Sequence, residues 1–471
     1  MKKGEILENV HVLSMAAEGK CVSRIEGKVL FIEGAAPGDI ADIQLTRIKS
    51  SFLEGKATTI IKESENRTTP FCEHFGICGG CKWQHLSYDV QLQYKQQQVQ
   101  DNLERIGGLQ LPGIRPIKGS ENIKHYRNRL DFSAASQRWL TPEEMAAKIP
   151  FGEPALGFHM PKSFDKVFDV HECHLQANPS NAIRLAIRDV CIKQNIPFFD
   201  LRKQVGFLRT VTIRTSSIGE IMVIVQVAGD DTGMREKILH ALADQFPEIT
   251  SLNYVINQKR NDTFNDLEII TWKGQPYITE TMTKPDGSAT LQFRIGPKSF
   301  YQTNSAQAER LYKVAWELAD LSGDELVFDL YTGTGTIANY VANSAKHVIG
   351  LEYVEPAIED AKVNSHLNNI KNTEFYAGDI KDLLDTAFLD KHGKPDIVIT
   401  DPPRAGMHED VCNMLLQAEP KRIVYVSCNP ATQARDLKIL SSKYSIVAVQ
   451  PVDMFPHTMH VENVVSLVLT T

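Results

Sequence analysis

The stretch of sequence that decides the fold is LVFDLYTGTGT at positions 326–336. It is a short apolar run that ends in an acidic residue and passes into a turn rich in glycine and threonine. Gly333 and Gly335 let the backbone turn tightly and let a ligand approach it closely. The pattern predicts a buried strand, a ligand-binding turn and the start of a helix.

Similar apolar runs recur through the last part of the chain. Segments with helical patterns, such as Pro356–Asn369 and Glu409–Gln417, lie between them. Strands that alternate with helices of this length predict a parallel sheet with crossover helices. We therefore expect an α/β domain of the doubly wound, Rossmann-like kind over residues 291–471. The apolar runs are Leu326–Leu330, Val348–Leu351, Ile397–Ile399, Ile423–Val426, Ile446–Val449 and Val464–Leu469.

Acidic residues stand at four successive strand ends of this domain. Glu352 comes 19 residues after Gly333, and an acid at about that distance can bind both hydroxyls of a ribose. Asp379 and Asp401 follow the next two strands, and Asp329 ends the first. Any one of these acids could be a helix cap or a turn residue. All four at the same edge of one sheet indicate a ligand site.

The glycine pattern narrows the choice of ligand. The third glycine of the dinucleotide fingerprint is missing, because residues 336–338 supply none. This departure disfavours a nicotinamide cofactor and fits a mononucleoside-type cofactor, which has no pyrophosphate to bind. S-adenosylmethionine is the obvious candidate.

A thiol and a carboxylate follow on the same domain. The turn Asp401-Pro402-Pro403-Arg404 resembles the acid-Pro-Pro-aromatic turn of amino-methylating enzymes, with Arg404 in place of the aromatic. A lone Cys is usually a small buried hydrophobe, but Cys428 lies just past a strand, at the edge where α/β sheets bind ligands. C5 of a pyrimidine becomes nucleophilic only after a thiolate adds at C6, and a base must then remove the C5 proton. Cys428 and Glu462 have the chemistry for these two steps.

Together these motifs resemble the RNA uracil-5-methyltransferases, in the branch with an N-terminal TRAM barrel and an iron–sulfur cluster, nearest the 23S ribosomal RNA (uracil-5-)-methyltransferases. The resemblance covers essentially the whole chain and is most specific at 401–404, 427–430 and 455–462. It implies Cys428 as nucleophile and Glu462 as base. The family often has Cys where Thr332 stands and Asn where Thr336 stands, which puts contact details in doubt. The expected contacts to S-adenosylmethionine are Gln302, Tyr331, Gly333, Gly335, Thr336, Glu352, Asp379 and Asp401.

The rest of the chain predicts two further domains. Short alternating segments separated by Gly-, Pro- or charge-rich turns suggest a small β-barrel over residues 1–66. Such OB-like barrels often bind RNA, although a structural barrel without a ligand has the same pattern; the resemblance implies a TRAM domain. Residues 67–290 read as a central α+β domain, with strand-like runs at 207–213 and 221–227 and helix-like stretches at 178–194 and 234–246.

Four cysteines form a candidate metal site. Cys72, Cys78 and Cys81 have the spacing C-x5-C-x2-C, and Cys173 comes much later. Clustered thiols in a cytoplasmic protein indicate metal binding, and spacing alone leaves zinc and iron–sulfur equally open. The C-x3-C-x2-C pattern of radical enzymes is absent. The resemblance implies a 4Fe-4S cluster on all four thiols, with a structural or RNA-shaping role because the expected reaction needs no electron transfer.

The amino-acid composition argues against some classes of binding partner. The chain of 471 residues is 42% hydrophobic and 23% charged, with a formal net charge of −7. This balance argues against a wholesale basic nucleic-acid binder. Local basic patches at 202–214 and 127–129 are more simply a solvated face. Because no apolar stretch approaches membrane-spanning length, we expect a cytoplasmic protein with no membrane partner. We also expect a monomer.

Three functions remain open from the sequence. The leading one is C5-methylation of a flipped uridine in RNA, with 23S ribosomal RNA as the expected substrate and transfer RNA as the alternative. An exocyclic-amine methyltransferase is a second reading, which Arg404 and Cys428 disfavour. A non-enzymatic RNA-binding or ribosome-assembly factor on a methyltransferase fold is a third, which the presence of both Cys428 and Glu462 disfavours.

Overall fold

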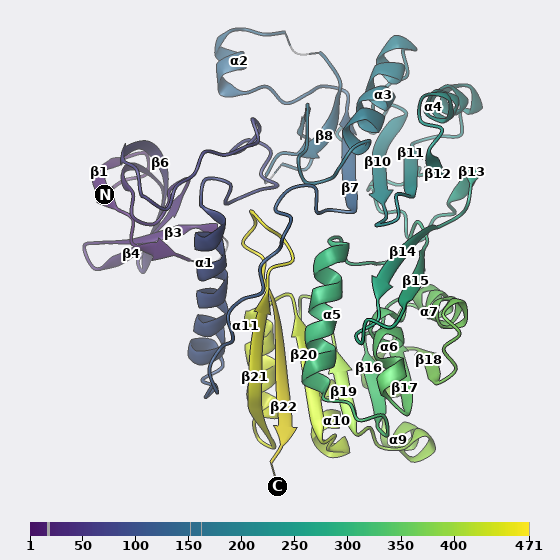
Figure 1. Ribbon diagram of the computed structural model, residues 1–471. Coiled ribbons are helices and arrows are strands. Elements are labelled where there is room, and N and C mark those ends of the chain that lie inside the picture. Colours follow the sequence, from purple (N-terminus) through teal and green to yellow (C-terminus); the bar gives the residue numbers. More distant parts are fainter. Residues whose placement is uncertain (17–18, 151, 162, 471) are drawn as a thin grey trace. The chain divides into compact units, whose positions relative to one another are not determined.

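The structure is a computed structural model that describes residues 1–16, 19–150, 152–161 and 163–470 (Figure 1). The chain divides into two compact units. The first consists of Met1–Ile123, Pro403–Gly406 and Ser427–Val465, and the second consists of Lys124–Pro402, Met407–Val426 and Ser466–Thr471. The division into three domains at residues 66 and 290 stays a prediction.

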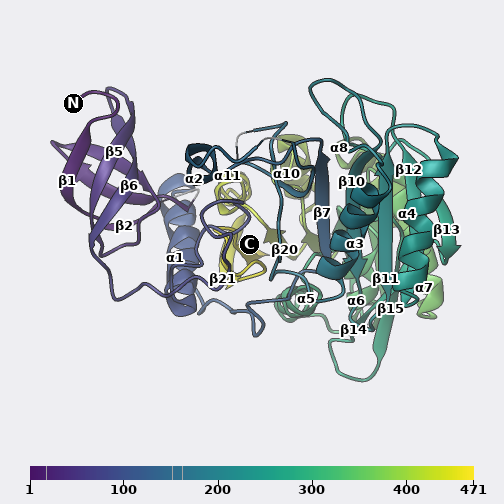
Figure 2. The same ribbon diagram turned by 90° about the horizontal axis from the view of Figure 1, so that it is seen from above.

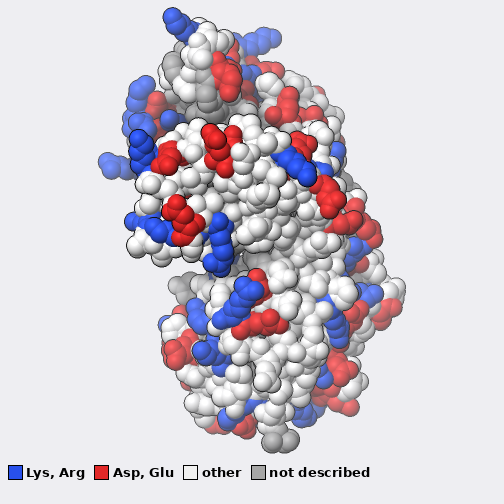
Figure 3. All heavy atoms as spheres, turned by 90° about the vertical axis from the view of Figure 1, so that its left-hand side faces the viewer, with Lys and Arg blue, Asp and Glu red and all other residues white. Residues whose placement is uncertain are grey.

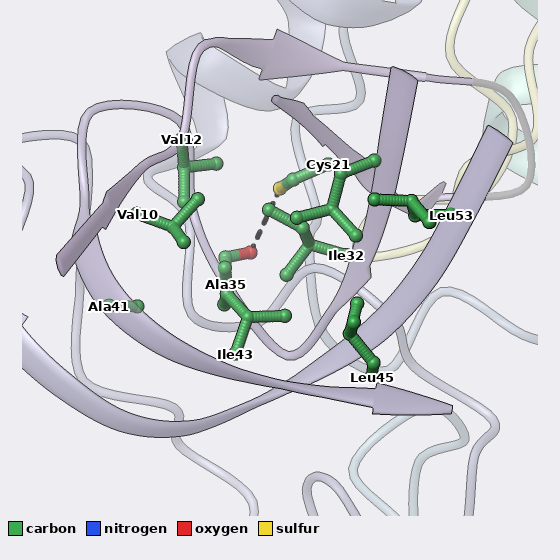
Figure 4. Close-up of a cluster of buried hydrophobic side chains, with 10 residues drawn as sticks. Val10, Val12, Cys21, Ile32, Ala35, Ala41, Ile43, Leu45 and Leu53 are labelled. Atoms are coloured by element: carbon green, nitrogen blue, oxygen red, sulfur yellow. Dashed lines mark hydrogen bonds between the residues drawn. The ribbon is translucent and has the colours of Figure 1, made fainter. Parts of the chain in front are cut away.

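The first unit begins with the predicted small barrel. Its sheet has the strand order β1-β5-β6-β4-β3-β2, and alternate residues of β3, β4 and β5 point inward. The inward side chains form a closed apolar core around Leu30, Ile32 and Ile43, each fully buried (Figure 4). The strands are β1 (Ile6–His11), β2 (Ser14–Met15), β3 (Cys21–Ile25), β4 (Lys28–Glu33), β5 (Ile40–Ile48) and β6 (Phe52–Lys62).

The remainder of the first unit joins distant parts of the sequence. Helix α1 (Tyr88–Asp101) continues into the π-helical turn η2 (Asn102–Ile106), and these pack against α11 (Pro430–Leu440) and β21 (Tyr444–Val452). The buried positions of α1 include two polar residues, Gln91 and Lys95. Strand β22 (Glu462–Leu469) follows and neighbours β21 in its sheet.

The second unit contains a mixed sheet with the order β13-β12-β11-β10-β7-β8-β9. Helices α3 (Ser180–Lys193) and α4 (Thr232–Gln245) lie side by side on one face of it (Figure 2). Strand β11 is buried along its whole length, as its largely apolar sequence predicts. The strands are β7 (Arg129–Ala135), β8 (Ala155–His159), β9 (Val167–Phe168), β10 (Leu208–Thr215), β11 (Ile221–Val227), β12 (Ile249–Ile256) and β13 (Ile270–Gly274). A short helix α2 (Pro142–Ala146) and a separate hairpin of β14 (Ile278–Thr283) and β15 (Thr290–Ile295) complete this region.

The second unit also contains the predicted parallel sheet. Strands pair in parallel in the order β18-β17-β16-β19-β20. The last half of β22 lies beside β20 here, since the backbone N–H of Leu469 donates to the carbonyl of Lys421 at 3.1 Å. The parallel α/β sheet expected from the sequence is thereby confirmed. The strands are β16 (Leu326–Leu330), β17 (His347–Glu352), β18 (Thr373–Ala377), β19 (Ile397–Thr400) and β20 (Arg422–Ser427). The helices are α5 (Ser305–Ala319), α6 (Thr336–Val341), the 3-10 turn η3 (Ala342–Ser344), α7 (Glu355–Leu367), α8 (Ile380–Leu383), α9 (Thr386–His392) and α10 (Glu409–Ala418).

The molecular surface carries both signs of charge. On the face drawn in Figure 3, Lys and Arg side chains are interspersed with Asp and Glu over most of the area. This agrees with the slightly acidic net charge of −7. Within the described residues, no helix has the length and apolar character that a membrane crossing needs.

Candidate functional site

The turn after β16 has the backbone that its glycines predict. Gly333 and Gly335 both have positive φ, at +54° and +73°. A Cβ added to Gly335 would come within 2.8 Å of the Ala361 methyl group, so this position requires glycine for close packing. A Cβ at Gly333 would meet nothing within 4 Å. The backbone at Gly333 therefore faces open space that a ligand can enter.

The carboxylate of Glu352 is fixed beside this turn. One oxygen accepts the backbone N–H of Gly333 at 3.1 Å, and the other accepts that of Val354 at 3.0 Å. Each oxygen keeps a further lone pair, so the group can still accept the two hydroxyls of a ribose. The chemistry of these residues fits S-adenosylmethionine, with the acid held at the end of β17 as the sequence predicts.

Two more acids lie at the ends of neighbouring strands, Asp329 fully buried and Asp401 half-buried. Burial raises the pKa of Asp329 to about 7, helped by the charges of Asp401 and Glu352 and opposed by hydrogen bonds from Thr332 and Ala338. Burial also raises the pKa of Asp401 to about 7. One oxygen of Asp329 accepts Thr332 at 2.5 Å and Ala338 N–H at 2.9 Å, while the other has no hydrogen-bond partner among the described residues. These strand ends are therefore poised to exchange protons near neutral pH.

Asp379 is already engaged within the protein. Its side chain caps α8 by accepting the backbone N–H of Lys381 at 3.2 Å, and it pairs with the Lys381 ammonium at 3.1 Å. The hydrogen bond from that ammonium is the largest cause that lowers the pKa of Asp379. A ligand contact by Asp379 would have to share or replace these partners.

Gln302 lies in a segment that other parts of the second unit hold. The Asn128 side-chain amide donates to the Gln302 carbonyl at 2.9 Å, and the Asn128 backbone N–H donates to Thr303 at 2.8 Å. The buried Arg214 guanidinium donates to the carbonyl of Ser299 at 2.8 Å. Arg214 is therefore structural, and its burial lowers its pKa to about 9. The solvated face expected for residues 202–214 is wrong at Arg209 and Arg214, which are both buried.

The predicted nucleophile lies in the first unit, directly after β20. Ser427 and Asn429 form a local turn around Cys428, since the Ser427 hydroxyl accepts the Asn429 N–H at 3.1 Å. The Asn429 side chain caps α11 through the N–H of Ala431 at 3.2 Å. Cys428 itself is half-buried, so its thiol is reachable from the surface.

Arg404 contacts both the segment that contains Cys428 and the segment that leads into Glu462. The Asn429 side-chain amide donates to the Arg404 carbonyl at 3.1 Å, and one guanidinium nitrogen of Arg404 lies 2.6 Å from Nδ1 of His460. His460 stands two residues before Glu462, which is 4% exposed and begins β22. The first unit thus brings together the segments of the predicted nucleophile and the predicted base.

Three of the four predicted metal-binding thiols lie in one tight segment of the first unit. The Cys78 sulfur accepts backbone N–H groups from Gly80 and Cys81, which lower its pKa, although burial is the larger cause and raises it. Cys72 is anchored by the Gln84 side chain, which accepts its N–H at 3.2 Å. Cys173 is buried in the second unit. Hydrogen bonds from N–H groups to sulfur fit a thiolate ligand of an iron–sulfur cluster or of zinc.

Sequence reasoning did not single out two exposed aromatic residues beside the expected donor-binding residues. Tyr353 follows Glu352 and is 71% exposed, and Phe300 precedes Gln302 by two positions and is 69% exposed. Aromatic side chains of this kind are normally covered. The signal that could have found Tyr353 is its place directly after Glu352, the acid predicted to bind a ribose.

Known proteins are similar to this chain over nearly its whole length. Residues 3–58 match the TRAM domain, and residues 268–470 match the tRNA (Uracil-5-)-methyltransferase family. A protein of Bacteroides thetaiotaomicron named an uncharacterized RNA methyltransferase is 54% identical over 97% of this chain and 100% of its own length. One of Porphyromonas gingivalis with the same name is 54% identical over 98% and 100%. The crystal structure of Pyrococcus abyssi tRNA (uracil-54, C5)-methyltransferase with S-adenosyl-L-homocysteine superposes with a TM-score of 0.74, at 28% identity, over 98% of this chain and 100% of that one.

The fold is that of an S-adenosylmethionine-dependent methyltransferase with an N-terminal TRAM domain. The chain belongs to the RNA uracil-5-methyltransferase family. It is an RNA methyltransferase, and its substrate is RNA.

Proposed function

We propose that this enzyme methylates C5 of a specific uridine through a covalent adduct with Cys428, and that Glu462 removes the C5 proton. The observation that carries the proposal is the shared contact of Arg404, which binds Asn429 next to Cys428 and His460 just before Glu462. A half-buried thiol and a buried carboxylate in one compact unit are the pair that this chemistry requires.

The proposed reaction begins with addition of the thiol to the pyrimidine ring. The Cys428 thiolate forms a bond to C6, and the electron pair of the C5–C6 double bond moves toward C5. C5 then takes the methyl group of S-adenosylmethionine, whose carbon–sulfur bond breaks to release S-adenosyl-L-homocysteine. Glu462 accepts the C5 proton, the double bond re-forms and the thiolate leaves. The uridine has to be flipped out of its stack for the thiol to reach C6.

The methyl donor is proposed to contact Gln302, Tyr331, Gly333, Gly335, Thr336, Glu352, Asp379 and Asp401. S-adenosylmethionine supplies the electrophilic methyl group. Support comes from the open space at Gly333 and from the Glu352 carboxylate held at the same turn. Asp379 is the weakest member of this set, because Lys381 and the start of α8 already occupy its oxygens.

We propose 23S ribosomal RNA as the substrate, because the TRAM domain and the cysteine set resemble that branch of the family. Transfer RNA is the second candidate, since the superposed Pyrococcus abyssi enzyme is named for tRNA. Mapping of 5-methyluridine in ribosomal and transfer RNA, from cells with and without the gene, tests both. Loss of one ribosomal 5-methyluridine is the expected result. Loss in transfer RNA alone supports the second candidate, and no loss in either RNA contradicts the proposed activity.

We further propose that Cys72, Cys78, Cys81 and Cys173 hold a 4Fe-4S cluster with a structural role. The N–H groups that point at the Cys78 sulfur support a thiolate ligand there. Protein purified without oxygen should contain iron and acid-labile sulfide and should show broad visible absorbance, which Cys78→Ser should remove. Protein that contains zinc and shows no such absorbance would end the cluster proposal.

A further inference from the structure

The loop that leads into Glu462 has an unusual backbone. This loop, residues 453–461, connects β21 to β22, and we call it the base loop. His457 within it has a φ of +64°, in the left-handed region that residues with a side chain rarely adopt. Such a conformation persists only where surrounding contacts determine it. Because Glu462 directly follows the base loop, the contacts that hold this loop help to fix the position of Glu462.

Helix α1 holds the start of the base loop through a buried ion pair. The Lys95 ammonium lies 2.5 Å from one oxygen of Asp453, and both side chains are fully buried. Lys95 also donates to the carbonyl of Phe455 at 3.0 Å, and the Tyr88 hydroxyl donates to the second Asp453 oxygen at 2.8 Å. Because a buried charge has to be paired, these contacts fix Asp453 against α1.

Gln91, one turn before Lys95 on α1, holds the strained residue itself. Its side-chain oxygen accepts the backbone N–H of His457 at 2.8 Å, and its side-chain nitrogen lies 3.2 Å from Nδ1 of the same residue. Nε2 of His457 lies 3.0 Å from the carbonyl of Ile123. A carbonyl only accepts, so Nε2 carries the proton and Nδ1 is the acceptor that faces Gln91.

The cysteine segment holds the same residue from another direction. The backbone N–H groups of Lys82 and Trp83, directly after Cys81, both donate to the His457 carbonyl, at 2.8 and 3.0 Å. The Gln91 side-chain nitrogen also donates to the carbonyl of Trp83 at 3.0 Å. His457 is thus the point where α1, the cysteine segment and the base loop meet.

We propose that Gln91 is a positioning residue for the base Glu462, and that through His457 it also couples the cysteine segment to that base. The inference rests on the proposed function, in which Glu462 removes the C5 proton after methyl transfer. Gln91 is fully buried and touches no expected substrate or cofactor residue. Its loss should therefore affect proton removal and leave the addition of Cys428 to the uridine unchanged.

Gln91→Met tests the inference, because Met has a similar length and no hydrogen-bonding amide. Elimination should slow on the order of tenfold, so that a methylated adduct with natural uridine RNA accumulates on denaturing gels. The same variant should trap 5-fluorouridine RNA at the native rate, since that adduct depends on Cys428. A purely structural defect would slow adduct formation and elimination together, and that result would overturn the inference.

Gln226→Met is the matched control. Gln226 is a fully buried glutamine on β11 of the second unit, so the substitution is the same and the location differs. It should accumulate no adduct. Thr458→Val disturbs the base loop directly and leaves α1 unaltered. The Thr458 hydroxyl donates to the Phe455 carbonyl at 2.8 Å inside the base loop, and the substitution removes this hydrogen bond. It should accumulate adduct as Gln91→Met does.

Hydrogen exchange provides a readout that does not depend on activity. Backbone amides of the base loop should exchange faster in Gln91→Met, and also in Cys78→Ser, which alters the cysteine segment, while β11 keeps its native protection. Unchanged exchange in the base loop in either sample contradicts the coupling. If Glu462→Gln accumulates adduct and neither Gln91→Met nor Thr458→Val does, Gln91 is not a positioning residue. The assignment of Glu462 as the base then still stands. If Glu462→Gln itself accumulates none, the proposed base has failed and the positioning role with it.

Discussion

The backbone N–H of Gly333 donates to the carboxylate of Glu352 at 3.1 Å, which joins the glycine turn after β16 to the end of β17. The contact sets the carboxylate beside open space at Gly333 and leaves lone pairs on both of its oxygens. It is the geometry expected of an acid that recognises the ribose of S-adenosylmethionine.

Glu352→Ala should weaken the binding of S-adenosylmethionine on the order of 10- to 100-fold, the loss expected for hydrogen bonds to a charged group. Isothermal titration calorimetry measures the effect. Glu355→Ala is the control, because Glu355 is an exposed residue of the first turn of α7 three positions away. Equal affinities for the two variants would count against Glu352 as the ribose acid.

The free energy of unfolding of the ligand-free protein should depend on pH through the titration of Asp329. Its pKa is about 7 when folded, against an ordinary value of 3.8. Between these values the folded state keeps a proton that the unfolded state has lost, so the contribution of Asp329 to the free energy of unfolding falls as pH rises, by up to about 1.4 kcal/mol per pH unit. Urea unfolding across this range should show the native protein losing stability relative to Asp329→Asn. A constant difference between the two proteins across the range would contradict the raised pKa.

Thiol reactivity should separate Cys428 from the buried cysteines. Burial raises the pKa of Cys191 to about 12 and that of Cys21 to about 12, so both stay protonated and unreactive at neutral pH. Brief treatment with iodoacetamide should therefore modify Cys428 and spare Cys191 and Cys21, as mass spectrometry of tryptic peptides would show. Cys428→Ala should abolish turnover and retain binding of RNA and S-adenosylmethionine, whereas Cys191→Ala should remain active. Turnover by Cys428→Ala near the native rate would refute the nucleophile.

The Lys95–Asp453 pair should matter to the stability of the first unit. Both groups are fully buried at 2.5 Å, and removal of one partner leaves the other charge buried and uncompensated. Lys95→Met should lower the free energy of unfolding by about 3–5 kcal/mol. Lys56→Met, on the exposed side of β6, should change it by less than about 0.5 kcal/mol. Similar midpoints for the two variants in urea would show that the pair is not buried as described.

Much of the sheet could be predicted from short patterns. The runs at β16 and β11 have the bounds that the sequence predicts, because strands buried on both faces need mainly apolar residues between turn signals. Glu352 could be placed from its spacing to Gly333, since a strand, a helix and a second strand occupy a nearly fixed length of chain.

Other features could not be predicted, because their partners are distant in sequence. Helix α1 has polar residues at buried positions, so its hydrophobic periodicity is weak. The partner of Lys95 is Asp453, which lies 358 residues later in the sequence. Asp379 was predicted as a ligand contact, yet a short acid after a strand can equally cap the next helix, as its contacts with Lys381 show. The last apolar run predicts a strand from Val464, whereas β22 begins two residues earlier, at Glu462.

The central claim is that Glu462 removes the C5 proton after Cys428 has added to C6, and Glu462→Gln tests it most directly. The amide is a far poorer base than a carboxylate with an ordinary pKa of about 4. Addition and methyl transfer should proceed, elimination should stall, and radiolabelled natural uridine RNA should stay bound to the protein as a slow band on a denaturing gel. Glu65→Gln, an exposed position of the first unit, is the control and should give no such band. Normal turnover by Glu462→Gln without an adduct would contradict the account.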